Sequence, residues 1–365
     1  MGFNCGIVGL PNVGKSTLFN AIIGTAAAAA ENYPFCTIEP NVGRVPVPDP
    51  RLEQVARVAG SPKTVPTQLE VVDIAGLVRG ASRGEGLGNR FLGAIREVDA
   101  ILHLLRCFEG GDVAHVEGAV DPVRDLELVE TELLLADIAS LERRVEGLTK
   151  RARGGDPEAK DQLALIETVL PEMQAGRPAH ALELGAGQRA ALGTLQLLTA
   201  KPVLYVFNVD EAAAAHGNDL SAAAAARAAA VGAGVVIVSA AIEAEVAALP
   251  RDEALEYLHA LGLEQPGLER VIVAGHRLLD LITFFTAGPK EARAWTIRRG
   301  TRALDAAGLI HSDFKRGFIC AEVASCEAFV RHGGEAKMRE AGKLRQEGRD
   351  YVVRDGEVVR FRFNV

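Results

Sequence analysis

Gly9-Leu10-Pro11-Asn12-Val13-Gly14-Lys15-Ser16 decides the fold, because this stretch fits the pattern G-x-x-x-x-G-K-[ST]. The apolar run before it, residues 3–8, predicts a strand, and the pattern of residues 15–23 after it predicts a helix. Successive backbone N–H groups in such a loop, together with the helix N-terminus, form a site for phosphate groups. We expect Lys15 to reach the β- and γ-phosphates of a nucleotide and the Ser16 hydroxyl to bind Mg²⁺.

A second motif lies downstream, where the apolar run of Val71-Val72-Asp73-Ile74-Ala75-Gly76 ends in a carboxylate. The pattern D-x-x-G alone mostly marks a turn, but downstream of a phosphate-binding loop it is a strong signal. We expect Asp73 to hold Mg²⁺, usually through water, and the Gly76 N–H to sense the γ-phosphate. Thr37, which lies between the two motifs, is expected to close on Mg²⁺ and the γ-phosphate as a switch.

A third motif, Asn208-Val209-Asp210-Glu211, follows the apolar run 203–207, where the nucleotide base is expected to be read. Guanine-specific proteins use Asn-Lys-x-Asp at this position, since a short carboxylate accepts hydrogen bonds from guanine N1–H and N2–H₂. Here Val replaces the Lys and the longer Glu replaces the Asp. Mismatched buried polar groups are costly, so the local chemistry argues against a strong preference for guanine. Ser239-Ala240-Ala241, after the next apolar run, fits the loop that backs the base.

Water positioning for hydrolysis is the part of the mechanism that the motifs leave open. Ras-like proteins place a Gln directly after D-x-x-G to orient the attacking water, and this chain has Leu77 there. His115, in a glycine-rich stretch, is a candidate because an imidazole can position or deprotonate water near neutral pH. From the residues alone, a surface histidine of no consequence is the better interpretation.

The chain as a whole has the pattern of an α/β protein with one long helical interruption. Further apolar runs at 69–72, 100–105, 203–207 and 235–238 are typical of buried parallel strands and predict a doubly wound sheet. From 125 to 173 the pattern is helical throughout, apart from a strong breaker at 154–157. We therefore expect an inserted hairpin of two antiparallel helices in a coiled coil.

The C-terminal part is expected to be a compact unit of short strands, with strands at 292–297 and 317–323. A final β-hairpin is predicted, in which 351–353 and 358–363 flank the turn signal Asp355-Gly356. Residues 290–365 hold 16 Lys and Arg against 11 Asp and Glu, a net charge of +5, within a chain of net charge −8. This asymmetry suggests an anionic partner for the C-terminal part, and a solvated basic face is an equal alternative.

Composition excludes several classes of protein. The chain has 365 residues, 48% hydrophobic and 24% charged, which excludes a disordered chain, a collagen-like chain and a membrane bundle. No window is apolar for the length that a bilayer requires, and the first residues show no secretory signal. Five cysteines are too few, and odd in number, for a disulfide framework, so we expect a reducing, cytoplasmic location.

These motifs together resemble the Obg-like ATPase (YchF) family of P-loop proteins, over the whole chain. The resemblance rests on the motifs above and on Gly84–Gly88, Phe284–Gly288, Ala294–Thr296 and Phe361–Val365. It implies a P-loop GTPase-like fold that prefers ATP to GTP, the inserted helical hairpin, and a C-terminal TGS domain of β-grasp type. It also implies association with ribosomes and a link to oxidative-stress responses.

Three further residues gain a role from the resemblance. Phe108 matches a residue thought to line the adenine pocket, and His115 matches the family's proposed catalytic histidine, which now favours function there. Asn12 lies at the position where some relatives bind a K⁺ ion. Whether this chain also binds K⁺ there is left open.

The resulting hypothesis is a slow, Mg²⁺-dependent ATPase that acts as a molecular switch, associates with ribosomes (rRNA and ribosomal proteins), and binds neither membranes nor specific DNA. A GTPase of the same architecture is one rival, and a ribosome-binding regulator that holds nucleotide without significant turnover is another.

The expected domains are a nucleotide-binding domain (1–122 and 198–280), the helical hairpin (123–197) and the TGS-like domain (281–365). The expected catalytic residues are Lys15, His115 and Gly76, and the metal ligands are Ser16, Thr37 and Asp73. The expected nucleotide-binding residues are Asn12, Val13, Gly14, Lys15, Ser16, Thr17, Phe108, Asn208, Val209, Glu211, Ser239, Ala240 and Ala241.

Overall fold

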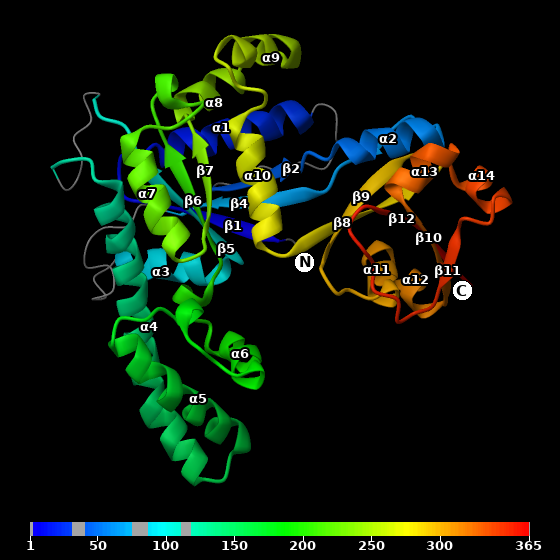
Figure 1. The fold of residues 1–365 in the computed structure, drawn as a ribbon. Coiled ribbons are helices and arrows are strands. Elements are labelled where there is room, and N and C mark those ends of the chain that lie inside the picture. The colour runs from blue at the N-terminus through cyan, green and yellow to red at the C-terminus, as the bar shows by residue number, and fades with distance from the viewer. Residues whose placement is uncertain (1–2, 31–40, 75–86, 111–117, 365) are drawn as a thin grey trace. The chain divides into compact units, whose positions relative to one another are not determined.

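The structure is a computed structural model that describes residues 3–30, 41–74, 87–110 and 118–364. The chain divides into two compact units (Figure 1). Of the described residues, the first holds 3–25, 41–43, 70–74, 87–110 and 118–275, and the second holds 26–30, 44–69 and 276–364.

A six-stranded sheet, ordered β2-β4-β1-β5-β6-β7, carries the first unit. The pairs β1–β4, β1–β5, β5–β6 and β6–β7 are all parallel, as expected for strands that helices connect. Every residue of β5 is buried, which explains why this strand appears in the sequence as a continuous apolar run. The doubly wound sheet is therefore confirmed. The strands are β1 (Asn4–Val8), β2 (Val42–Pro46), β4 (Gln68–Asp73), β5 (Ala100–Arg106), β6 (Val203–Asn208) and β7 (Gly234–Val238).

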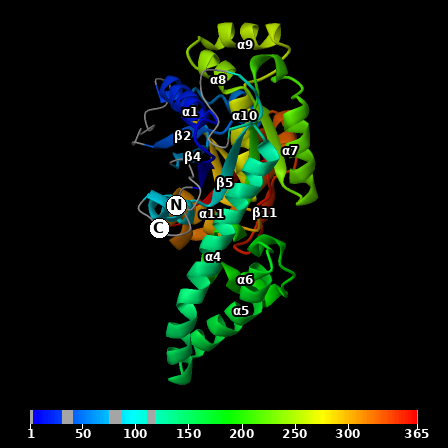
Figure 2. The same ribbon diagram turned by 90° about the vertical axis from the view of Figure 1, so that its left-hand side faces the viewer.

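Helices flank this sheet and follow its strands along the chain (Figures 1 and 2). The functionally important one is α1, which begins at Lys15, directly after the loop that leaves β1. Short segments, η2 (Ala179–Ala181), η3 (Gly193–Leu195), η4 (Leu198–Ala200) and η5 (Glu211–Ala213), complete the unit. The helices are α1 (Lys15–Ala30), α3 (Leu87–Glu97), α6 (Ala186–Leu192), α7 (Asp219–Ala230), α8 (Ala240–Val246), α9 (Arg251–Ala260) and α10 (Gly267–Leu278).

The inserted helical hairpin consists of α4 (Pro122–Arg153) and α5 (Pro157–Gln174), which confirms the prediction (Figure 2). The Asp121 carboxylate caps α4 by accepting hydrogen bonds from the backbone N–H groups of residues 123 and 124. Gly155, at φ +92°, turns the chain, and Asp156 caps α5. The two helices share an apolar core that includes Leu141, Leu148, Ile166, Val169 and Met173.

A second sheet, ordered β11-β10-β12-β8-β9-β3, carries the second unit. Strand β12 is parallel to β8 and antiparallel to β10, so the sheet is mixed. Its strands are β3 (Thr64–Val65), β8 (Leu281–Ala287), β9 (Ala292–Arg298), β10 (Phe318–Ser325), β11 (Arg345–Glu347) and β12 (Glu357–Phe363). Its helices are α2 (Pro50–Ala59), α11 (Ala303–Ile310), α12 (Ser312–Arg316), α13 (Cys326–His332) and α14 (Glu335–Glu340).

Within the segment 44–69, which groups with the second unit, α2 and β3 pack against the second sheet, although the expected boundaries placed them with the nucleotide-binding domain. Leu52 and Val55 of α2 share a buried cluster with Phe285 and Phe329, and β3 pairs with β9. An apolar face on a short helix does not reveal which of two sheets it covers, so local pattern could not assign this segment.

The predicted C-terminal β-hairpin is wrong. Residues 351–353 form no strand, and Val352 makes only an isolated bridge to Arg302. The turn is instead fixed to β8, because the Asp355 carboxylate accepts from the Thr283 N–H and the Gly356 N–H donates to the Thr283 carbonyl. These non-local bonds place β12 between β8 and β10.

No helix in the described part of the chain is both long enough and apolar enough to cross a bilayer.

Asp137 of α4 offers a test of how the hairpin is joined to the rest of its unit. Its carboxylate, 1% exposed, accepts hydrogen bonds from the Leu198 N–H (2.9 Å), the Thr199 N–H (2.9 Å) and the Thr199 hydroxyl (2.8 Å). We expect Asp137→Ala to lower the free energy of unfolding by about 3 kcal/mol, because it leaves buried donors unpaired. Urea denaturation followed by circular dichroism measures the change.

The matched control is Glu146→Ala, which removes an exposed carboxylate from the same helix. Its ion pair with Lys150 is solvent-exposed, so we expect a change within about 0.5 kcal/mol. Equal effects of the two substitutions would contradict the role given to Asp137.

Candidate nucleotide-binding site

The loop between β1 and α1 is fixed by buried anchors and by two left-handed residues. Val13 is 1% exposed, whereas Asn12 (φ +66°) and Gly14 (φ +93°) take conformations that turn the chain tightly. A Cβ on Gly14 would lie 2.3 Å from the Asn208 Nδ2 atom, and one on Gly9 would lie 2.6 Å from the Leu104 carbonyl oxygen. Close approach therefore requires glycine at both positions, and the positive φ requires it at Gly14 as well.

Lys15 and Asp73 lie together at the start of α1, as the two motifs predicted. The Lys15 Nζ is 3.4 Å from the Asp73 Oδ1, and the two side chains are only 12% and 18% exposed. Parallel pairing of β1 with β4, with Ile7 opposite Asp73, brings the carboxylate to the edge where the loop begins. Ser16, in the first turn of α1, is exposed, as is Thr17. This edge thus presents a cation, a carboxylate, a hydroxyl and a helix N-terminus.

Asn208 connects three segments of the site. Its side chain is almost fully buried, donates a hydrogen bond to the Val13 carbonyl (2.9 Å) and accepts one from the Ala240 N–H (2.9 Å). The amide therefore joins the phosphate-binding loop to the segment that contains Ser239, Ala240 and Ala241. Because these bonds use the Asn208 side chain on the protein itself, its main role is to hold the loops together.

The other residues of the base motif differ in exposure. Val209 is 2% exposed, whereas Glu211 is exposed and begins the short segment η5. The Asp210 carboxylate caps that segment by accepting from the Ala213 N–H. The residue that replaces the usual Lys is thus part of the core, and the residue that replaces the usual Asp faces solvent.

The segment that backs the base begins at the end of β7. Ser239 and Ala240 are buried and Ala241 is exposed. Among the described residues, the buried Ser239 hydroxyl has no hydrogen-bond partner, which leaves a polar group at this edge of the sheet.

The chain that follows β5 approaches the same edge, and two residues that sequence reasoning missed fix it there: Arg106, the last residue of β5, and Asn218, the N-cap of α7. The Cys107 N–H donates to the Asn208 carbonyl (2.8 Å), and the Asn218 Nδ2 donates to the Cys107 carbonyl (2.7 Å). Phe108, half-buried, follows directly. A charged residue at the end of a buried strand that is otherwise apolar except for His103 was the available signal for Arg106, whereas no pattern marked Asn218.

Two titratable groups near this edge are uncharged at neutral pH. Burial lowers the pKa of His103 on β5 to about 3, and burial together with Asp125 raises the pKa of the Cys107 thiol to about 12. Neither is therefore a candidate for the proton-transfer role considered for His115.

Three of the predicted site residues, Thr37, Gly76 and His115, lie outside the described residues. The others come together at the C-terminal edge of the parallel strands, where open α/β sheets bind their ligands.

The donor set at this edge suits Mg²⁺. The Ser16 hydroxyl and the Asp73 carboxylate are hard oxygen donors close to the predicted phosphate site. In the described part of the chain, no cluster of three His, Cys, Asp or Glu residues is placed to hold a metal alone.

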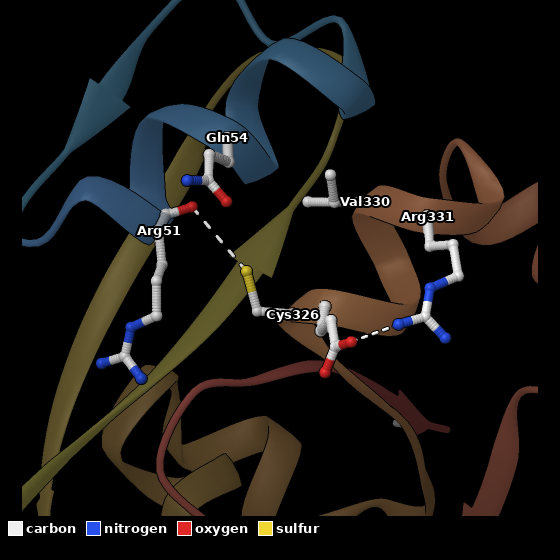
Figure 3. A pocket seen from close by; sticks show the side chains of 6 residues that line it. Arg51, Gln54, Cys326, Val330 and Arg331 are labelled. Atoms are coloured by element: carbon white, nitrogen blue, oxygen red, sulfur yellow. Dashed lines mark hydrogen bonds and ion pairs between the residues drawn. The ribbon is translucent and has the colours of Figure 1, made fainter.

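A pocket of about 360 Å³ in the second unit does not offer comparable chemistry (Figure 3). It lies between α2 and α13 and is lined by Arg51, Gln54, Cys326, Glu327, Val330 and Arg331. Glu327 is paired with Arg331, and Arg51 is paired with Asp49 and Asp355. Burial raises the pKa of the Cys326 thiol, so the sulfur stays protonated and weakly nucleophilic.

Comparisons with known proteins agree with this geometry. A family model for 50S ribosome-binding GTPases matches residues 4–153, and the model YchF-GTPase_C, described as a protein of unknown function, matches residues 281–364. The ribosome-binding ATPase YchF of Escherichia coli O157:H7 is 53% identical, and all of both chains is covered. The Obg-like ATPase 1 of Gallus gallus is 45% identical over 98% of this chain and 92% of its own.

A solved structure described as the YchF GTPase of Schizosaccharomyces pombe superposes with a TM-score of 0.89 at 36% identity, covering 99% of this chain and 98% of that one. With a full-length relative at 53% identity, a close structural match and the P-loop geometry described above, the chain belongs to the YchF family of Obg-like, P-loop ATPases.

Proposed function

We propose that this chain binds Mg²⁺ and ATP at the C-terminal edge of its parallel sheet and hydrolyses the ATP to ADP and phosphate as a slow switch. The observation that carries the proposal is the juxtaposition of the phosphate-binding loop, the Lys15–Asp73 pair and the Asn208 bridge. Relatives that are named as ATPases, at 45% and 53% identity, support the same reaction.

The phosphate end of the site is assigned to Lys15, Ser16 and Asp73. Loop N–H groups from Asn12 to Thr17 would surround the phosphates, and Lys15 would stabilise the charge that develops on the γ-phosphate. Ser16, Asp73 and Thr37 would hold Mg²⁺, which neutralises charge on the phosphate oxygens when bound. Lys15 now pairs with Asp73, so a bound triphosphate would compete for this cation. Binding of a K⁺ ion beside Asn12 is left open in this proposal.

The base end of the site is assigned to Phe108, Asn208, Val209, Glu211 and the segment 239–241. The apolar, buried Val209 and the exposed Glu211 do not reproduce the paired donors and acceptors that select guanine. ATP is therefore the preferred substrate in this proposal, with the GTPase of the same architecture as its alternative.

Hydrolysis is assigned to His115 as the group that positions water, with the Gly76 N–H sensing the γ-phosphate. Leu77 cannot orient water, so turnover would be slow and would depend on His115. Leu77 also supports the second candidate, a ribosome-binding regulator that holds nucleotide without significant turnover.

The proposed partner is the ribosome, through rRNA and ribosomal proteins in the cytoplasm. The relative from Escherichia coli is named a ribosome-binding ATPase, and residues 290–365 have a net charge of +5 within an acidic chain. A positive unit on an acidic body favours an anionic partner. The proposal includes no membrane and no specific DNA.

Lys15→Ala tests the phosphate site. We expect the Kd for ATP to rise by about 100-fold, because a charge-assisted contact to phosphate is lost. Isothermal titration calorimetry with Mg²⁺ present measures this, and Lys150→Ala, at an exposed position of α4, is the control that should bind normally. An unchanged affinity in Lys15→Ala would exclude the assignment.

Parallel titration of the nucleotide-free protein with ATP and GTP tests the base site. We expect ATP to bind at least about tenfold more tightly, and phosphate release to be slow in the same samples. The double substitution Val209→Lys and Glu211→Asp restores the guanine-reading pattern and should shift the ratio toward GTP. Equal or reversed preference in the wild-type protein would favour the GTPase, and tight binding without turnover would favour the regulator.

His115→Ala tests the catalytic assignment. We expect kcat to fall by about 100-fold with the Kd for ATP unchanged, since only water positioning is removed. His216→Ala changes an exposed histidine on another loop and should leave kcat as it is. A wild-type turnover number in His115→Ala would remove this residue from the mechanism.

A further inference from the structure

Strand β5 ends in a buried charge that the site assignments above do not use. Arg106 is 3% exposed and lies opposite Asn208 in the pairing of β5 with β6. Burial of a guanidinium costs folding free energy unless its N–H groups are hydrogen-bonded, so the burial of Arg106 points to a specific role.

The guanidinium of Arg106 fixes the next few residues of its own chain. Its Nε donates to the Phe108 carbonyl (3.2 Å) and its Nη2 donates to the Gly110 carbonyl (2.7 Å). Its Cζ lies 4.6 Å from the centroid of the Phe108 ring, within the range of a cation–π contact. One planar group thus holds the backbone at two points and covers one face of the aromatic ring.

This segment is attached to the base motif by its backbone. The Cys107 N–H donates to the Asn208 carbonyl, and the Asn208 side chain contacts both the phosphate-binding loop and Ala240. Phe108 therefore follows, by one residue, the point where this segment is bonded to Asn208. Ligands of open parallel sheets bind at this edge, so the half-buried ring lies where a nucleotide base would be.

We propose that Arg106 is a positioning residue for the nucleotide base: it holds the Phe108 ring in place as one wall of the base site. The inference rests on the proposed function, because a base site presupposes a bound nucleotide. With one face against the guanidinium, the exposed part of the ring is available to a purine. Stacking on an aromatic ring tolerates different bases, so this contact strengthens the binding of ATP and GTP alike.

Arg106→Lys tests this role, because lysine lacks the planar, forked guanidinium. The variant keeps the positive charge but cannot make the two planar bonds or the same ring contact. Phe108→Leu removes the ring and keeps an apolar side chain. Arg227→Lys is the matched control, because Arg227 also forms ion pairs within the first unit, with Glu127 and Glu130, outside the base site.

The ligands are ATP, GTP and inorganic tripolyphosphate, each with Mg²⁺, and calorimetry gives their Kd values. We expect Arg106→Lys and Phe108→Leu each to weaken ATP and GTP by about tenfold, with tripolyphosphate within about twofold of wild type. The double variant should bind no more weakly than Phe108→Leu alone, because Arg106 acts through the ring. Arg227→Lys should bind all three ligands as the wild type does.

Three results with the variants, and one with the wild-type protein, would overturn the proposal. Equal weakening of tripolyphosphate and ATP would show a general structural role for Arg106, and additive losses in the double variant would show that it does not act through Phe108. Unchanged nucleotide affinity in Phe108→Leu overturns the proposal even if Arg106→Lys does not fold. If Arg106→Lys does not fold, weaker binding of both nucleotides by Phe108→Leu, with tripolyphosphate binding retained, supports the proposal. If the wild-type protein does not bind ATP, both the proposed function and this inference are contradicted. The wild-type titration is done before any variant is compared, so this outcome is distinguished from failure of the inference alone.

Discussion

The Asn208 side chain makes the interaction on which the rest of the nucleotide site depends. Buried at the end of β6, it donates to the Val13 carbonyl and accepts from the Ala240 N–H, so one amide joins loops from three parts of the chain. The close approach explains Gly14, where any Cβ would collide with the Asn208 amide nitrogen. A buried amide that lost one partner would leave a polar group unsatisfied, which makes the arrangement specific as well as stable.

The helical hairpin is joined to the nucleotide-binding sheet by buried polar contacts rather than by its apolar core alone. Tyr205, on the strand that ends at Asn208, donates a hydrogen bond to Glu130 of α4 (2.6 Å), and Arg227 pairs with the same carboxylate. Two turns further along the same face of α4, Asp137 holds the segment that leads back into β6. Directional bonds of this kind fix the root of a long helix more precisely than apolar packing does. The root of the hairpin and the base motif are thus parts of one connected structure.

The sequence was sufficient for features set by local pattern or by a fixed motif, and insufficient for those set by distant contacts. The strand–loop–helix at Gly9–Ser16, the buried strands and the hairpin breaker at 154–157 all follow from spacing and turn chemistry. Packing of α2 and β3 with the second sheet depends on which apolar surface is available, which local pattern does not contain. The predicted C-terminal hairpin failed for the same reason, since Asp355 and Gly356 bond to Thr283, far away in the sequence. Among the site residues, Lys15, Asp73 and Asn208 could be placed from motifs, whereas Arg106 and Asn218 act on backbone groups that no motif specifies.

The same geometry limits how strongly the site could discriminate between adenine and guanine. Asn208 is used within the protein, Val209 is part of the core, and Glu211 is exposed on a short turn. Strong discrimination requires buried polar groups that are left unpaired by the wrong base, and an exposed carboxylate retains water as an alternative partner. In the proposed base site, an aromatic wall such as Phe108 would add affinity without discriminating between bases. The proposed preference for ATP would then result mainly from the absence of guanine-specific contacts, and would be set by modest differences in binding free energy.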